Sequence, residues 1–412
     1  MLSLSKILSL TLRRGLAISA LFSIISVAAA QQSGVTLYGI LDLGITYESV
    51  QRDARQSIAG ESQINQSVFG MSNGVQSGSR WGLRGVEWLG DGVSVDFTLE
   101  GGFNPAQGVS AQGGRLFGRQ STLGLSMQDV GRLDIGRQIN LASNYFLNID
   151  PFAEGFGQAN IGASFGSANT TRYGNMVLVQ AKPLGGLTLG AGYSFATELS
   201  AIYTEGQPCV ATQSCSAQAG AYNFASSQNL RAVTLGAHYK NGPVEAALVY
   251  DKLYGDTSQT DGGADPSAWI LGGAYDFNTV RVALAFGRTS NGFFNGQSSG
   301  TGSVTPSGLS TISWDAGVVL FLPGAQASSY MVGLSAPLSG QTTLLASWQM
   351  MQPQGLLSGN LDYKTQQIYS AALTQQLSPR TNVYAYTSYG QNLGMINTAE
   401  SFMIGVGIRH KF

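Results

Sequence analysis

The sequence predicts a transmembrane 16-stranded antiparallel β-barrel. The strand prediction rests on two observations: apolar and polar residues alternate along most of the chain, and short turns alternate with long polar connections. Alternation with a period of two is typical of strands with one apolar and one polar face. No segment after residue 30 approaches 18 consecutive apolar residues, so no transmembrane helix is predicted.

Residues 1–30 are predicted to be a signal peptide. Three basic residues precede the apolar run "GLAISALFSIISV" of 13 residues, which closes on three alanines. This order is typical of a secretory signal and its cleavage site. A membrane anchor is the alternative, but a spanning helix needs roughly 20 residues. The sequence therefore predicts export, with residues 31–412 forming one barrel domain.

The first predicted strand shows the alternation clearly. "VTLYGILDLGITY" (35–47) places apolar residues on one face, with Tyr38 and Asp42 on the other. "VSVDFTLEGGF" (93–103) and "LTLGAGYSF" (187–195) repeat this pattern. In a membrane barrel the apolar face meets lipid and the polar face meets the lumen, so Tyr38 and Asp42 are expected to face the lumen.

The connections set the number of strands. Seven short turns, rich in Gly, Pro, Asn or Asp, alternate with eight long polar segments, which implies sixteen strands. The short turns lie at 89–92, 128–131, 182–186, 240–243, 276–279, 337–341 and 377–381. The long segments lie at about 49–77, 104–114, 139–169, 197–228, 252–266, 288–326, 352–363 and 389–399. A soluble sandwich has no reason to collect its long loops at one end, whereas an outer-membrane barrel does.

Closure follows from the membrane environment. In hydrocarbon every backbone donor and acceptor needs an internal partner, so a spanning sheet must close on itself. Sixteen strands leave a lumen too wide for side chains to fill. The apolar segment 311–324 is assigned to the loop before strand twelve, because a seventeenth strand would give an odd number, which bacterial barrels avoid.

Charge and cysteine content narrow the function. Without residues 1–30, which hold three basic and no acidic residues, 19 Lys and Arg face 23 Asp and Glu, a net charge of −4. This balance does not indicate a nucleic-acid-binding protein. Cys209 and Cys215 form a close pair, which in an exported protein favours a disulfide that closes a loop. Zinc binding is the alternative, although no histidine is near.

Catalysis and metal binding have weak support. After residue 30 the only histidines are His238 and His410. "GASFG" (162–166) matches the Gly-x-Ser-x-Gly motif, but it lies in a glycine-rich loop and not on a strand–turn–helix. "DGGAD" (261–265) is a weak calcium candidate. The alternatives that stay open are a substrate-selective channel and a surface adhesin or receptor barrel.

Five segments together resemble the general porins of Gram-negative bacteria, especially those of beta-proteobacteria. They are "VTLYGILDLGITY", "SRWGLRGVEWLGDG", "GRLDIGRQ", "TRYGNMVLVQAKPLGGLTLGAGYS" and "GVGIRHKF". The resemblance implies an outer-membrane homotrimer of barrels, each a water-filled channel for passive diffusion of small hydrophilic solutes and ions. It implies no enzyme activity and no cofactor. The implied partners are outer-membrane lipid, lipopolysaccharide and the barrel assembly machinery.

The resemblance also implies a pore constriction, made where the third external loop folds back into the barrel. The segment 139–169 has this position, and its "DPFAEGFG" differs from the family's Pro-Glu-Phe-Gly tip. In the family this loop presents carboxylates to the pore, so Asp150 and Glu154 are the candidates. The alternative is that each acid only tethers its own loop.

Opposite these acids we expect a wall of arginines. Arg80 shares its strand face with Gly82 and Arg84, and an arginine facing lipid costs about 2–4 kcal/mol near the midplane. These side chains, and by the same reasoning Arg172, are expected in the lumen. Arg137 is similar to a third pore arginine of the family, but two apolar residues share its face, so a strand end or bulge must turn it inward. Arginines at the narrowest section predict anion preference.

The last predicted strand, "FMIGVGIRHKF", must pair with the first. The residues expected to face lipid are Phe402, Ile404, Val406 and Ile408, and those expected to face the pore are Gly405, Gly407 and Arg409. The resemblance makes Phe412 part of the signal that the outer-membrane assembly machinery recognises.

Overall fold

The computed structural model describes residues 34–53, 63–203, 229–255, 265–297, 318–358 and 362–412. The predicted signal peptide, the Cys209–Cys215 pair and all but the last residue of the 261–265 motif lie outside these residues. Within them, no helix is long and apolar enough to cross a membrane.

Strands dominate the described part of the chain. They are β1 (Gly34–Arg52), β2 (Ile64–Asn73), β3 (Arg80–Gly90), β4 (Val93–Asn104), β5 (Val109–Ser110), β6 (Gln120–Met127), β7 (Gly131–Ile139), β8 (Arg172–Leu184), β9 (Leu187–Ser194), β10 (Ser200–Tyr203), β11 (Arg231–Asn241), β12 (Val244–Tyr254), β13 (Ser267–Asp276), β14 (Arg281–Phe293), β15 (Val318–Pro337), β16 (Thr342–Gly355), β17 (Gln366–Ser378), β18 (Thr381–Gln391) and β19 (Glu400–Lys411). The helical elements are α2 (Leu141–Phe146) and the 3₁₀ helices η2 (Gln112–Gly114), η3 (Gly157–Ala159), η4 (Ile161–Ala163), η5 (Gly166–Ala168) and η7 (Leu393–Met395).

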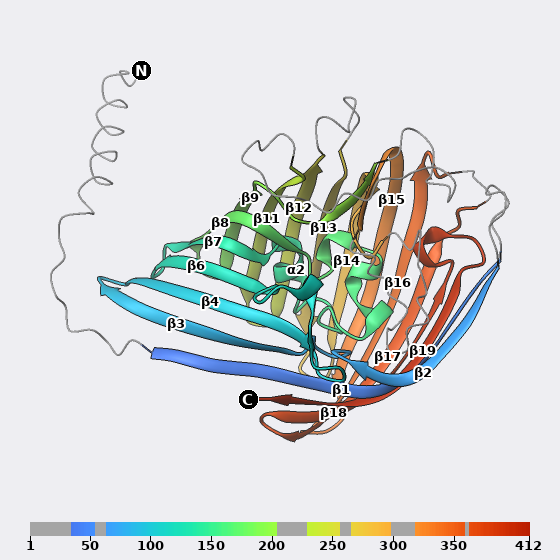
Figure 1. Cartoon of the computed structure of the whole chain (residues 1–412), viewed down its shortest axis with the longest axis horizontal. Coiled ribbons are helices and arrows are strands. Elements are labelled where there is room, and N and C mark those ends of the chain that lie inside the picture. Colours follow the sequence, from blue (N-terminus) through green and yellow to red (C-terminus); the bar gives the residue numbers. More distant parts are fainter. Residues whose placement is uncertain (1–33, 54–62, 204–228, 256–264, 298–317, 359–361) are drawn as a thin grey trace.

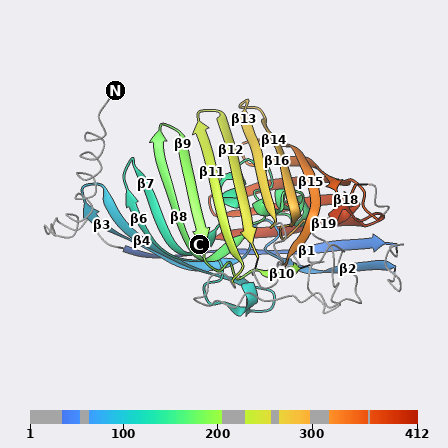
Figure 2. The same ribbon diagram turned by 90° about the horizontal axis from the view of Figure 1, so that it is seen from above.

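The strands close into a barrel because β1 pairs with β19 antiparallel, from Ile40 opposite Lys411 to Gln51 opposite Glu400. The described residues contain 19 strands in one sheet. Of these, the short β5 and β10 add no strand to the wall. β2 and β3 pair with successive parts of β1 and count as one interrupted strand. Sixteen wall strands therefore remain in the described part of the chain, as predicted; Figure 1 and Figure 2 show their arrangement.

The outer face of the barrel is apolar. On β1, Val35 is 66% and Leu37 60% exposed, whereas Asp42 on the opposite face is fully buried. The exposed large apolar side chains of β19 are Phe402, Ile404, Val406 and Ile408, the set predicted to face lipid. Strands that span hydrocarbon and enclose water show this division.

The seven short turns occur where the sequence predicts them. They join β3 to β4, β6 to β7, β8 to β9, β11 to β12, β13 to β14, β15 to β16 and β17 to β18. Each turn joins two strands that pair antiparallel, so the turn residues were sufficient to predict the seven hairpins.

Two predicted loops, 49–77 and 288–326, contain long stretches of strand. β1 continues to Arg52 and β2 begins at Ile64, inside the predicted loop 49–77. These polar strand ends lack apolar alternation, but they pair with each other directly. Residues 318–324, assigned to a loop within 311–324, begin β15, where they meet the end of β14 beyond a register shift. They lengthen an existing strand, so the number of strands does not change.

The segment 140–171, between β7 and β8, packs against the inner face of the barrel. Its helix α2 contacts β9, β11 and β12. Glycines on the wall make room for this helix: a Cβ on Gly236 would lie 2.8 Å from the Tyr145 ring, and one on Gly272 would lie 2.6 Å from the Phe146 ring. The segment therefore occupies part of the space that the strands enclose (Figure 1). We call it the inner loop.

The middle of the inner loop reaches the opposite wall. Phe156 packs edge-on against Tyr384 and Tyr386 of β18, and the same buried cluster includes Phe152 and Met403 of β19. The inner loop is thus held by apolar contacts on one wall and by α2 on the other.

Candidate pore constriction

The alternation on β1 identifies the lumenal face of β3. Leu37 points outward, so its neighbour Tyr38 points inward. Tyr38 pairs with Gly82 of β3. Arg80 and Arg84 lie two residues away on either side of Gly82, and hence on the same face. The Arg84 guanidinium lies 5.3 Å from the centre of the Tyr38 ring, within reach of a cation–π interaction.

One carboxylate, Glu100 of β4, binds two arginines. Its Oε1 lies 2.7 Å from Arg119 Nε and 3.8 Å from Arg80 Nη1, and its Oε2 accepts a hydrogen bond from Tyr38 Oη at 3.0 Å. Arg80 also donates from Nε to the carbonyl oxygen of Gly78 at 2.8 Å. These bonds hold the guanidinium groups at fixed places on the wall.

Arg172 joins this group from the start of β8. Its Nη1 donates to the carbonyl oxygen of Thr170 at 2.9 Å, and its charge interacts with those of Arg119, Arg80 and Glu100. We call Arg80, Arg119, Arg172 and Glu100 the arginine cluster. Its three cations and one anion leave a formal charge of +2.

Arg137 lies beside the arginine cluster and has a different acidic partner. Its Nη1 lies 3.5 Å from Glu198 Oε2, which is also 3.4 Å from Arg115 Nη2. β7 shifts its register against β8 on either side of Arg137, which is the irregularity that the prediction required there. The charge of Arg137 also reaches that of Arg172.

Asp42 is a buried structural acid and not a solvated lumenal one. Its Oδ1 accepts a hydrogen bond from Tyr384 Oη at 2.6 Å, and its Oδ2 accepts one from the backbone N–H of Ser77 at 2.7 Å. Ser77 Oγ in turn accepts from Arg80 Nη2 at 3.3 Å. Asp42 therefore fixes the break between β2 and β3 that positions Arg80.

Asp150 and Glu154 lie inside the inner loop, 2% and 6% exposed. Asp150 accepts hydrogen bonds from the backbone N–H groups of Phe152, Glu154 and Ile161, and Glu154 accepts one from Thr170. Burial raises the pKa of Asp150 to about 6, and burial together with Asp150 raises the pKa of Glu154 well above its usual range. Both acids thus bind backbone N–H groups of their own loop, the tethering arrangement that the sequence left open as the alternative.

The sequence prediction omits Glu100 and Arg119. Glu100 lies on the polar face of a strand in which polar and apolar residues alternate. This position was the sequence signal that could have placed Glu100 in the lumen. Arg119 directly precedes β6, where alternation assigns no face. The two meet only because β4 pairs with β6, with Glu100 opposite Gln120.

Comparisons with known proteins agree with this arrangement. A family model described as Gram-negative porin matches residues 16–394. The chain belongs to this family. An outer membrane porin protein of Bordetella pertussis is similar to this porin, with 45% identity over 97% of this chain and 100% of the relative.

Solved structures share the fold of the porin. An anion-selective porin from Comamonas acidovorans has 22% identity and a TM-score of 0.64, covering 92% of this chain and 100% of that one. The trimer form of OmpT from Vibrio cholerae has 12% identity and a TM-score of 0.53, covering 93% and 100%.

The family assigns location and function. The protein is a porin of the Gram-negative outer membrane, and it forms a channel for passive diffusion of small hydrophilic solutes. The predicted family, location and function are thereby confirmed.

Proposed function

We propose that this porin prefers anions and that the arginine cluster lines the narrowest section of its channel. The observation that carries the proposal is the sharing of Glu100 by Arg80 and Arg119 beside Arg172, which leaves +2 on the lumenal wall. The local field at a narrow section acts on a passing ion more than the total charge of the protein does. The anion-selective porin from Comamonas acidovorans shares this fold, which supports the proposal.

The other predicted site residues have supporting roles in this proposal. Arg137 and Arg84 extend the positive wall on either side of the arginine cluster, and Tyr38 orients Glu100. Asp150 and Glu154 shape the inner loop from buried positions, and Glu154 adds little opposing charge because burial, together with Asp150, favours its neutral form.

A planar-bilayer recording tests the proposal. The purified porin, placed in a tenfold gradient of potassium chloride, should give stepwise conductance with a reversal potential of the sign for chloride preference. A reversal potential at zero, or one of the opposite sign, would contradict anion preference while leaving the channel itself intact.

We propose further that the porin is a homotrimer in lipid and lipopolysaccharide, inserted by the barrel assembly machinery with Phe412 as part of the signal. The trimeric OmpT form supports this by its likeness of fold. Chemical cross-linking in detergent should give a band of three chains, and conductance should rise in groups of three. A chain that stays monomeric in both assays would contradict the trimer.

Processing of the chain has its own test. We propose that residues 1–30 are removed on export and that Cys209 and Cys215 form a disulfide. Mass spectrometry of the purified porin should show a chain that begins near Gln31. Thiol labelling of the denatured chain should increase by two groups after reduction, and equal labelling with and without reductant would exclude the disulfide.

We propose that the chain is a channel without enzymatic activity. Ser164 of the "GASFG" motif is fully buried and accepts a hydrogen bond from Gln366 Nε2 at 3.1 Å. The His238 imidazole contacts Glu245 at 3.0 Å, and that of His410 contacts Thr381 at 2.8 Å. Hydrolysis of a nitrophenyl ester by the purified porin, lost on Ser164→Ala, would overturn this proposal.

A further inference from the structure

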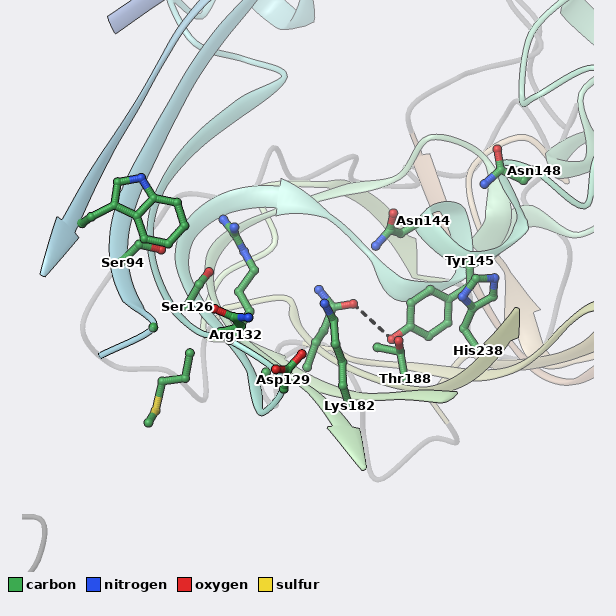
Figure 3. A pocket seen from close by; sticks show the side chains of 16 residues that line it. Ser94, Ser126, Asp129, Arg132, Asn144, Tyr145, Asn148, Lys182, Thr188 and His238 are labelled. Carbon is green, nitrogen blue, oxygen red and sulfur yellow. Dashed lines mark hydrogen bonds between the residues drawn. The ribbon is translucent and has the colours of Figure 1, made fainter. Parts of the chain in front are cut away.

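A cavity of about 580 Å³ separates α2 of the inner loop from the hairpin ends of β3–β4 and β6–β7. Arg132, Lys182, Asn144, Asn148, Tyr145 and His238 are among its lining residues (Figure 3). Tyr145 lies against the wall of this cavity: its ring stacks on the His238 ring with centroids 5.1 Å apart and planes 23° apart. Its hydroxyl donates to Gln180 Oε1 at 3.1 Å. The side of α2 that faces the wall is therefore held by an aromatic stack and one hydrogen bond.

The His238 imidazole of this stack belongs to a group of charged side chains on the wall, which we call the charge centre. Glu245 of β12 is 2% exposed. Its Oε1 lies 3.0 Å from His238 Nε2, and its Oε2 lies 3.2 Å from Lys240 Nζ and 2.8 Å from Arg281 Nη2. One buried carboxylate thus organises an imidazole and two cations from β11 and β14.

Arg281 gives this charge centre a second contact with the inner loop, in addition to the stack of Tyr145 on His238. The same Nη2 that binds Glu245 lies 3.3 Å from the carbonyl oxygen of Asn148. Tyr145 and Asn148 lie about one helical turn apart, so Glu245 reaches both through different partners. We call His238, Glu245 and Arg281 the wall latch.

The rest of the inner loop is fixed differently. Phe152 and Phe156 are buried among aromatic side chains of the opposite wall, and Gln349 Nε2 donates to the carbonyl oxygen of Ala159 at 2.8 Å. These contacts need no charge. The wall latch is in contrast electrostatic, so its strength depends on a single carboxylate whose loss leaves two cations side by side.

We propose that Glu245, acting through His238 and Arg281, is a positioning residue that holds the Tyr145–Asn148 end of the inner loop against the wall and so keeps the channel open. The inference rests on the inner loop narrowing the channel. It does not rest on anion preference, because the wall latch contacts none of the residues of the arginine cluster. Loosening the wall latch lets α2 move toward the lumen, where it obstructs the ion path.

Single-channel recording of Glu245→Gln tests the wall latch against a matched control. Asp129→Asn also removes one carboxylate charge, from the β6–β7 turn that lines the cavity beside α2, and Asp129 makes no hydrogen bond or ion pair in the described part of the chain. Glu245→Gln should raise the frequency of brief closures about tenfold or more, the effect of losing roughly one hydrogen bond to a charged group. Asp129→Asn should leave the closure frequency at the wild-type level.

A pair of substitutions at Arg281 separates positioning from general damage. Arg281→Gln should raise closures as Glu245→Gln does, and Arg281→Lys should restore much of the quiet open state because it keeps the charge beside Glu245. The heat-dependent shift in gel mobility of each variant reports whether the barrel is folded, and only folded variants are recorded.

Several results would overturn the wall latch. They are quiet recordings from folded Glu245→Gln, equal closures from Arg281→Lys and Arg281→Gln, or equal closures from Glu245→Gln and Asp129→Asn. Failure of anion preference would appear instead in the reversal potential, so the two proposals fail separately.

Discussion

Replacing Arg80 and Arg172 by serine should abolish most of the anion preference of the porin. The arginine cluster carries three cations and Glu100, and the double variant leaves Arg119 alone beside Glu100, a formal charge of zero. In water, one charge about 5 Å from a passing ion contributes about 0.8 kcal/mol, or about a fourfold change in occupancy. Two charges give about sixteenfold before salt screening, whose length is about 10 Å at 0.1 M.

The assay is the reversal potential of the double variant in a tenfold potassium chloride gradient, recorded beside the wild type. We expect the chloride-to-potassium permeability ratio to fall severalfold, toward unity or below. Serine keeps the pore polar and is smaller than arginine, so the unit conductance should not fall. A reversal potential equal to that of the wild type would show that these arginines do not line the narrowest section.

Arg288 provides the matched control for charge. It lies on β14 with Leu284 and Phe286, which are 56% and 36% exposed on the outer face. Arg288→Gln therefore removes one positive charge from outside the lumen. Its reversal potential should equal that of the wild type, whereas a shift as large as that of the lumenal variants would mean that total charge, and not the local field, sets selectivity.

Three further predictions concern single residues. Glu100→Gln should strengthen anion preference, seen as a reversal potential further toward that of chloride, because it removes the carboxylate shared by the arginines; a shift toward potassium would contradict the charge assignment. Gly236→Val should lower unit conductance, because its Cβ would lie 2.8 Å from the Tyr145 ring and overpacking of about 1–3 kcal/mol would push α2 inward. Gly70→Val, with no atom within 4 Å of the added Cβ, should conduct normally, and equal conductance in both variants would refute the packing argument. Deletion of Phe412, whose backbone exchanges two hydrogen bonds with Gly39, should lower the yield of assembled barrel in membrane fractions without changing the conductance of survivors; an unchanged yield would speak against a role in assembly.

Local pattern was sufficient for the wall of this barrel. Alternation on the first and last strands identified the outer residues, such as Leu37 and Val406, and turn residues located the seven hairpins. These signals act between near neighbours in the chain, and the membrane enforces them because every polar side chain or unpaired backbone group facing lipid is costly. Local pattern was insufficient at 318–324, which the sequence assigned to a loop. This segment is a strand because it pairs with the end of β14, beyond a register shift.

The sequence by itself determined the fold class, the number of wall strands and the family. Only the tertiary structure decided which charges meet. Glu100 binds Arg119 because β4 lies beside β6, and Glu245 joins His238 and Arg281 because β11, β12, β13 and β14 lie in order along the wall. Asp150 is buried because the inner loop folds around it. Alternation reports which face a side chain takes, but a charge acts over a few ångströms in space, and those neighbours come from strand pairing and loop packing.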